Sequence, residues 1–326
     1  MSQVIAIVGP TASGKSALAL TLAEGVGGEI INADALQVYR GLDIGTAKPT
    51  PEDRRRVPHH LIDILDPGER YSAGEFARRA RIALAEISAR GRTAILVGGS
   101  GLYLRALWSG IAPLPPVDLA VRGRLLERLE RDGLQALYAE LAALDPTTAA
   151  RLGAGDTQRI LRALEVALAT GETLTSWIAR QPFGSEPMAM RKIGLTLPRA
   201  LLYDAIAARV EAMLSGGWLD EVRALVGAGT DRSCPAFQAI GYRQWIAVLD
   251  GVADFEAARQ QVVTLTKRFA KRQETWFRRE PGVEWWDARQ SRECLRSMLE
   301  MPAVAGGEPE KIAGIAEPAG APGGGG

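Results

Sequence analysis

The stretch VIAIVGPTASGKS, residues 4–16, decides the fold. Its first five residues are apolar and mostly β-branched, which predicts a strand buried on both faces of a parallel sheet. The next eight match the pattern GxxxxGK[ST] and open an expected helix over 15–24. These eight are Gly9, Pro10, Thr11, Ala12, Ser13, Gly14, Lys15 and Ser16. In such a P-loop, backbone N–H groups bind phosphate at a helix N-terminus and the lysine adds charge, so we predict a diphosphate site.

The residues that follow repeat the strand and helix pattern. A short strand is expected over 29–32, and two more over 61–65 and 94–97. Between the last two lies an amphipathic segment, 72–90, whose apolar residues recur at helical spacing. This alternation predicts an α/β protein with a P-loop NTPase-like core, in which helices flank a parallel sheet.

The pattern changes at Pro113, after which we expect only helices up to residue 181. Asp118, Asp145 and Asp156 are suitable N-caps for these helices, and Gly133 should break the first of them. We therefore predict that residues 117–187 form an all-helical insertion between two parts of the core, 1–116 and 188–302.

The second part of the core should return to strand at 192–196 and 283–286, with helices over 218–227, 235–249 and 254–279 between them. The end, 303–326, is rich in Gly, Ala and Pro, which predicts a disordered tail.

Composition excludes several classes of protein. The chain of 326 residues is 47% hydrophobic and carries a net charge of +1, so any affinity for nucleic acid must come from local basic patches. Its two cysteines are too few for a disulfide scaffold. The N-terminus lacks a basic region followed by a long apolar segment, so we predict a cytoplasmic protein without a membrane segment.

A P-loop alone does not identify the diphosphate. The expected strand 94–97 ends in Gly98-Gly99-Ser100 and lacks the Walker-B aspartate that an ATP-hydrolysing enzyme would need. Asp34, just after the strand 29–32, lies where α/β sheets bind ligands and is a candidate site residue. The alternative is that Asp34 only forms a turn ahead of Leu36.

Seven segments, in order, resemble the tRNA dimethylallyltransferase (isopentenyltransferase) family, and the resemblance runs from residue 4 to about 287. They are GPTASGKS (9–16), NADALQVYRGLDIGTAKP (32–49), VPHHLID (57–63), ILVGGSGLYLRAL (95–107), DTQRILRALEV (156–166), AIGYRQ (239–244) and TKRFAKRQETWFRR (266–279).

The resemblance implies a reaction and a role for several residues. The P-loop would hold the diphosphate of dimethylallyl diphosphate, with Mg²⁺ at Ser16, and Asp34 would be the general base. The acceptor would be the N6 amine of the adenosine just 3′ of the anticodon, in tRNAs that read codons beginning with U. That amine is a poor nucleophile, so a base and a stabilised leaving group both suit the chemistry. The family resemblance also suggests a monomer.

The same resemblance implies a set of tRNA-binding residues, which come from five separate segments. They are Asp34, Ala35, Leu36, Gln37, Ser100, Arg122, Gln158, Arg159, Ile160, Leu161, Arg162, Gly241, Tyr242 and Arg243. The sequence departs from the family at Ala35, where serine is usual, and at Ser100, where threonine is commoner. The first change removes a hydroxyl, and the second keeps one.

The expected helix 254–279 has an apolar stripe that includes Phe269 and Trp276 and should be mostly core. Its basic face, with Lys267 and Lys271, should meet tRNA phosphates. The cluster 54–56 is expected to be a solvated loop. Two other functions remain open on the sequence alone: an ATP-dependent kinase of a nucleotide or small metabolite, and a non-catalytic RNA-binding module.

Overall fold

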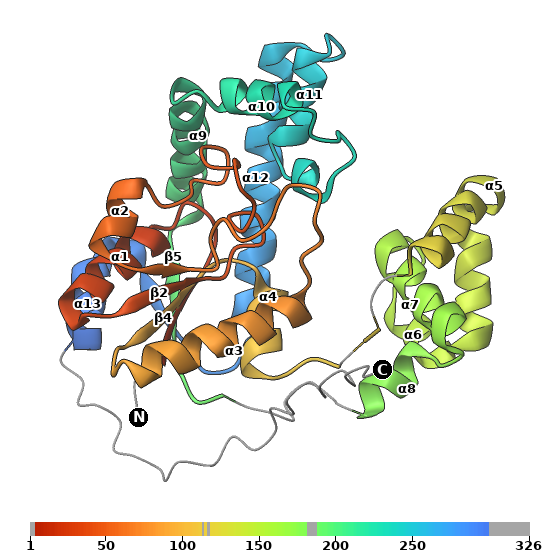
Figure 1. The fold of residues 1–326 in the computed structure, drawn as a ribbon, viewed down its shortest axis with the longest axis horizontal. Helices are drawn as coiled ribbons and strands as arrows, with labels where there is room; N and C mark the ends of the chain where they lie inside the picture. The colour runs from red at the N-terminus through yellow and green to blue at the C-terminus, as the bar shows by residue number, and fades with distance from the viewer. Residues whose placement is uncertain (1–3, 113, 116–117, 181–187, 300–326) are drawn as a thin grey trace, which may run out of the picture.

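A six-stranded, fully parallel sheet forms the centre of the protein (Figure 1). The computed structural model describes residues 4–112, 114–115, 118–180 and 188–299. The strand order is β3-β2-β4-β1-β5-β6, which places the strand before the P-loop in the interior of the sheet. The strands are β1 (Val4–Val8), β2 (Glu29–Asn32), β3 (His59–His60), β4 (Ala94–Val97), β5 (Arg191–Thr196) and β6 (Val283–Asp287).

Helices cover both faces of the sheet, as the apolar run in β1 predicts. Ile5 and Ile7 pack toward α1 (Lys15–Val26) and α13 (Ser291–Leu299). Ala6 and Val8 belong to the core cluster on the opposite face. That face is covered by α3 (Ala73–Ala89), which begins at its N-cap Ser72, and by α4 (Gly101–Trp108). Successive side chains of β1 therefore point to opposite faces of the sheet and pack into two separate cores.

A second group of helices lies above the carboxyl end of the sheet in Figure 1. It consists of α9 (Arg199–Ser215), α10 (Trp218–Gly227), η1 (Pro235–Gln238), α11 (Tyr242–Leu249) and α12 (Phe255–Arg278). The long helix α12 joins this group to the sheet, because Val262 lies in the upper core and Phe277 lies in the core beside the sheet. The middle of α12 is thereby held opposite the strand ends.

The segment after Pro115 forms a separate helical unit, which Figure 1 shows beside the rest of the molecule. Its helices are α5 (Leu119–Leu144), α6 (Pro146–Arg151), α7 (Thr157–Thr170) and α8 (Leu174–Arg180). The three predicted aspartate caps each accept a backbone N–H bond, and Gly133 interrupts α5 with φ 79°. No strand occurs among the described residues of this unit, 118–180.

Several sequence-based predictions were wrong in detail. The strand expected over 61–65 is irregular backbone, and the neighbouring strand is β3 instead. The cluster 54–56 ends a short helix, α2 (Pro51–Arg56), which a capping box at Thr50 initiates. The sequence reading also did not name α4, α9, η2 (Ala288–Gln290) or α13. The predicted tail, 303–326, lies outside the described residues.

Candidate functional site

Three loops that follow parallel strands meet at one edge of the sheet. The P-loop follows β1, Asp34 follows β2, and Gly98-Gly99-Ser100 follows β4. Because the strands are parallel, their carboxyl ends lie together at the place where α/β proteins bind ligands. Two cavities open there. One, of about 300 Å³, is lined by the P-loop, and the other, of about 600 Å³, is lined by Ser100, α9 and α12.

The two cavities share part of their walls, and the shared residues come from five separate segments. They are Thr11, Asp34, Thr46, Gly99, Arg209, Phe269 and Gln273. A molecule bound on the P-loop and a molecule in the second cavity would therefore face each other across Asp34.

Gly9 allows the start of the P-loop to pass close to the neighbouring strand β5. A Cβ at this position would lie 2.3 Å from the backbone oxygen of Leu195 in β5, and its φ of +138° is also unfavourable for other residues. The Nζ of Lys15 donates to the carbonyl of Pro10 at 2.5 Å, which folds the lysine back over the loop.

Gln273 of α12 connects the P-loop to the loop after β4. Its Oε1 accepts from the backbone N–H of Thr11 at 2.8 Å, and its Nε2 donates to the carbonyl of Gly99 at 3.1 Å. The side chain is buried. These bonds fix the long helix against two of the three loops, so the middle of α12 becomes a wall of both cavities.

We call the place where the two cavities meet the junction. The cations Lys15 and Arg209 and the carboxylate of Asp34 lie at or beside it. Burial and, to a lesser extent, the charge of Arg209 lower the pKa of Lys15 to about 7, although the nearby charge of Asp34 opposes the shift. Burial also lowers the pKa of Arg209, again opposed by Asp34. Lys15 as a residue is partly exposed, whereas its ammonium group is withdrawn against Pro10. A site in which desolvated cations outnumber the carboxylate is suited to bind an anion.

Asp34 both forms a turn and lines the cavities, so the two roles considered for it are compatible. Its Oδ1 accepts from the backbone N–H of Leu36 at 2.9 Å. The buried side chain of Asn32 brackets the same residue, accepting from Asp34 N–H at 3.0 Å and donating to Asp34 C=O at 3.2 Å. Beside it, Ser100 Oγ accepts from the backbone N–H of Ala35 at 3.2 Å. These bonds fix the direction of the carboxylate.

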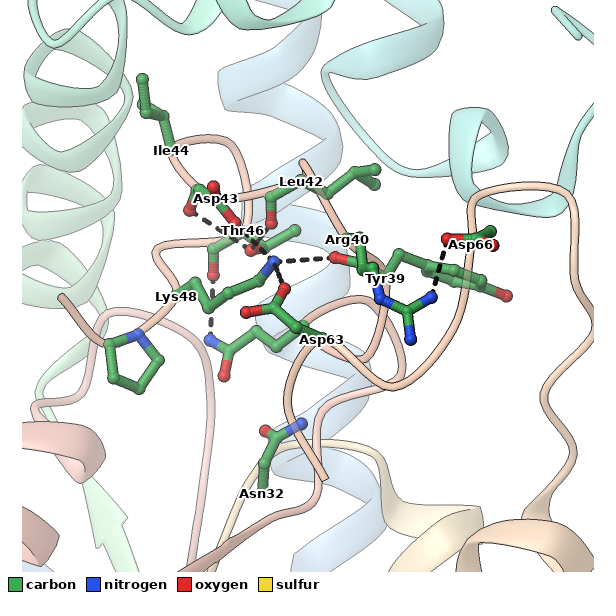
Figure 2. A network of polar contacts seen from close by, with 12 residues as sticks. Asn32, Tyr39, Arg40, Leu42, Asp43, Ile44, Thr46, Lys48, Asp63 and Asp66 are labelled. Carbon is green, nitrogen blue, oxygen red and sulfur yellow. Dashed lines mark hydrogen bonds and ion pairs between the residues drawn. The ribbon is translucent and has the colours of Figure 1, made fainter. Parts of the chain in front are cut away.

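The loop from 35 to 50 forms part of the wall of the first cavity. The side chain of Lys48 lies inside this loop and bonds several of its residues together (Figure 2). The Lys48 ammonium group donates to Asp43 at 2.5 Å, to Asp63 at 2.6 Å and to the carbonyl of Tyr39 at 2.7 Å, and its side chain is only 1% exposed. Gln37 donates to the carbonyl of Thr46 at 3.1 Å across the loop. This loop is therefore held by a buried ammonium group that pairs with two carboxylates, both of which reach solvent.

Tyr242 and Gly241 have structural positions that argue against the expected contact with RNA. Tyr242 is fully buried, and its hydroxyl donates to Glu221 at 2.6 Å. The same Glu221 accepts from the backbone N–H groups of residues 43–45. A Cβ on Gly241, which has φ +96°, would lie 2.0 Å from the ring of Trp218. Of this trio, only the exposed Arg243 keeps a side chain available to a ligand.

Some of the residues of the helical unit that were expected to bind tRNA are buried or ion-paired, and others are exposed. Ile160 and Leu161 are core residues of that unit. Arg122 and Arg162 both pair with the buried Glu165, at 3.4 and 2.8 Å. Gln158 and Arg159 are exposed. None of these residues lines either cavity, so any contact they make with RNA lies away from Asp34.

The side chains of Arg209, Phe269 and Gln273 are among those at the junction that the sequence analysis did not predict. Arg209 lies on α9, which the reading did not name, so no pattern directed attention to it. Phe269 was assigned to the core, but it lines both cavities, and Trp276 lines the second. Gln273 could have been noticed, because a glutamine among apolar residues on the inner face of a helix needs buried partners.

The described residues contain no cluster of three or more His, Cys, Asp or Glu side chains that could hold a metal ion. Ser16, at the start of α1, lines the first cavity and is exposed. Among the described helices, none is long and apolar enough to cross a membrane.

Comparison with known proteins gives a consistent result. The IPP transferase family model matches residues 37–280. A tRNA dimethylallyltransferase of Geobacter metallireducens is 47% identical over 284 residues, covering 87% of this chain and 92% of that protein. Another, of Halorhodospira halophila, is 50% identical over 278 residues, covering 84% and 89%.

Solved structures agree. A crystal structure of a tRNA isopentenylpyrophosphate transferase from Bacillus halodurans has a TM-score of 0.66 and 38% identity, covering 91% of this chain and 96% of that one. A eukaryotic dimethylallyltransferase acting on tRNA has a TM-score of 0.76 and 26% identity, covering 91% and 78%.

Proposed function

The chain belongs to the IPP transferase family. We propose that one of its two cavities binds the prenyl donor and that the other binds the acceptor nucleoside of tRNA. The protein is a prenyltransferase that transfers a dimethylallyl group to tRNA. Our proposal concerns the donor, the acceptor atom and the residues that act on them. The observation that supports it most directly is that Asp34, Arg209 and Gln273 line both cavities.

The donor, dimethylallyl diphosphate, binds in the first cavity. Its diphosphate lies on the backbone N–H groups of residues 9–16, where Lys15 and Arg209 supply positive charge. The buried hydroxyl of Ser13 has no hydrogen-bond partner among the described residues, and it would donate a hydrogen bond to a bound phosphate oxygen. The dimethylallyl group then points from the P-loop toward the junction.

The acceptor adenosine occupies the second cavity. Its lining combines flat side chains, Tyr103, Trp218 and Trp276, with polar Ser100 and Arg272, which suits an unstacked base. We assign the acceptor as the N6 amine of the adenosine just 3′ of the anticodon, in tRNAs that read codons beginning with U. A base in this cavity approaches Asp34 from the side opposite to the P-loop.

The reaction joins the adenine nitrogen to the first carbon of the dimethylallyl group while the bond from that carbon to the diphosphate oxygen breaks. Asp34 takes the proton that the amine loses. The P-loop N–H groups, Lys15 and Arg209 stabilise the negative charge that develops on the leaving diphosphate. Arg209 is thus placed to act on donor and acceptor at once, since it faces both cavities.

We propose Mg²⁺ as the cofactor. The site fits an ion held mainly by substrate, because Mg²⁺ commonly binds one or two protein oxygens plus phosphates, and Ser16 offers one hydroxyl beside the P-loop. When bound, the ion would neutralise charge on the diphosphate. We also expect the protein to act as a monomer in the cytoplasm.

The decisive experiment incubates purified protein with Mg²⁺, labelled dimethylallyl diphosphate and unmodified tRNA, and compares wild type with Asp34→Asn. The amide can keep the bond to the N–H of Leu36, so the turn survives while the base is lost. We expect the rate of transfer to fall about 10²- to 10⁴-fold while donor affinity changes little.

The matched control is Asp231→Asn, because Asp231 also accepts a backbone N–H bond two residues on but lines neither cavity. It should leave the rate unchanged. Full activity in Asp34→Asn would exclude the carboxylate as base. ATP turnover without any transfer to tRNA would overturn the assignment in favour of the kinase.

A further inference from the structure

We propose that Phe269 determines the length of the isoprenoid chain that the site accepts. This inference rests on the proposed function and adds a specificity-determining residue to it. Phe269 lies in the middle of α12 and is partly buried.

The position of the isoprenoid follows from the two cavities. The diphosphate is held on the P-loop in the first cavity, and the acceptor amine lies near Asp34 in the second. The reacting carbon must lie between them, so the hydrocarbon occupies the junction. Among the described residues that line both cavities, Phe269 alone has a purely hydrocarbon side chain. It is therefore the apolar surface against which the dimethylallyl group packs.

Phe269 is held in a fixed position. It precedes Gln273 by one helical turn on the same face of α12, and Gln273 is bonded to both Thr11 and Gly99. The guanidinium group of Arg272 lies 5.7 Å from the centroid of the Phe269 ring. Since the Gln273 bonds fix this part of α12, the backbone at Phe269 cannot shift easily to admit a larger group.

A longer donor would meet this ring. The first cavity measures about 300 Å³ and already contains the diphosphate site, so an added isoprene unit must extend past Phe269 into the second cavity. The adenine base needs that space. The ring therefore favours dimethylallyl diphosphate over geranyl diphosphate, which is one isoprene unit longer.

The test measures kcat/KM for the two donors with wild type and with Phe269→Ala, using unmodified tRNA and Mg²⁺. Removal of the ring should raise the ratio of geranyl to dimethylallyl transfer by about 10-fold or more, since pocket contacts of this size discriminate by that order. Phe269→Leu, which keeps more of the core volume, should shift the ratio in the same direction by less. It provides the measurement if the alanine variant fails to fold.

Trp276→Ala is the matched control, because Trp276 lies on the same helix but lines only the second cavity. It should change KM for tRNA and leave the donor ratio at the wild-type value. If wild type transfers the dimethylallyl group and neither Phe269 variant changes the ratio, the inference is wrong and the proposed function stands. If wild type transfers nothing from dimethylallyl diphosphate, the proposed function itself fails.

Discussion

Replacement of Lys15 by methionine should make the free protein more stable while it removes donor binding. The lysine holds its charge in a desolvated position, beside Arg209, before any diphosphate arrives. The variant removes that cost and keeps the length of the side chain. Function and stability should therefore change in opposite directions at this residue, as expected where a site is built to bind charge.

The magnitude follows from the pKa. A fall from the ordinary 10.5 to about 7 corresponds to a cost of about 5 kcal/mol for the protonated form. Because the residue is partly exposed, solvent relaxation reduces this, and we expect Lys15→Met to raise the free energy of unfolding by about 2 kcal/mol at pH 6. In a thermal melt this gives an increase of a few degrees in Tm.

The lowered pKa of Lys15 also determines how the stability of wild type relative to Lys15→Met changes with pH. Below pH 7 the lysine is protonated in both folded and unfolded chains, so the cost is complete there. Between about 7 and 10.5 the unfolded chain binds a proton that the folded chain lacks, so wild-type stability rises with pH relative to Lys15→Met. The stability difference between the two proteins should shrink across that window.

Donor binding gives an independent measurement. The diphosphate raises the pKa of Lys15, so at pH 8 wild type should take up a proton when it binds dimethylallyl diphosphate in the absence of tRNA. Titration calorimetry in two buffers of different ionisation enthalpy measures this uptake. Lys15→Arg, which keeps the charge but does not titrate, should show less of it.

Two outcomes would contradict the reasoning. If Lys15→Met is less stable than wild type at pH 6, the ammonium group does not cost free energy in the unbound protein. Equal proton uptake by wild type and Lys15→Arg would mean that Lys15 is already charged at pH 8.

Two further substitutions test the junction and the loop that covers it. Arg209→Met should lower kcat for tRNA prenylation by about 10²- to 10³-fold, because it removes a positively charged hydrogen-bonding group that faces the leaving diphosphate. It should also raise the pH at which Lys15 titrates, since the charge of Arg209 is one cause of the low pKa, and an unchanged pH midpoint would argue that the two cations do not interact. Lys48→Met leaves the carboxylates of Asp43 and Asp63 without their shared partner. Because these aspartates reach solvent, we expect chemical denaturation to show a loss of about 2 to 3 kcal/mol, less than for a fully buried pair, and a wild-type midpoint would refute a structural role for the cluster.

The sequence alone predicted those structural elements that are determined by residues close together in the chain. The P-loop and its strand are contiguous, so the apolar run and the glycine spacing predict a diphosphate site and a parallel sheet without any tertiary information. The aspartate caps at 118, 145 and 156 are local in the same sense. The structure confirmed the parallel sheet, the helix that follows the P-loop and the three caps, and the diphosphate site stays a prediction.

Only the tertiary structure decided which distant side chains share a cavity. Arg209 and Phe269 lie far along the chain from Asp34 and reach it because α9 and α12 pack over the strand ends. Tyr242, by contrast, has the shape of a base-stacking residue but is buried against Glu221. Helical periodicity shows which residues share a face of a helix, but it does not show whether that face meets a core or a cavity. That depends on the packing of the whole chain, because burial is a property of all the segments that surround a residue.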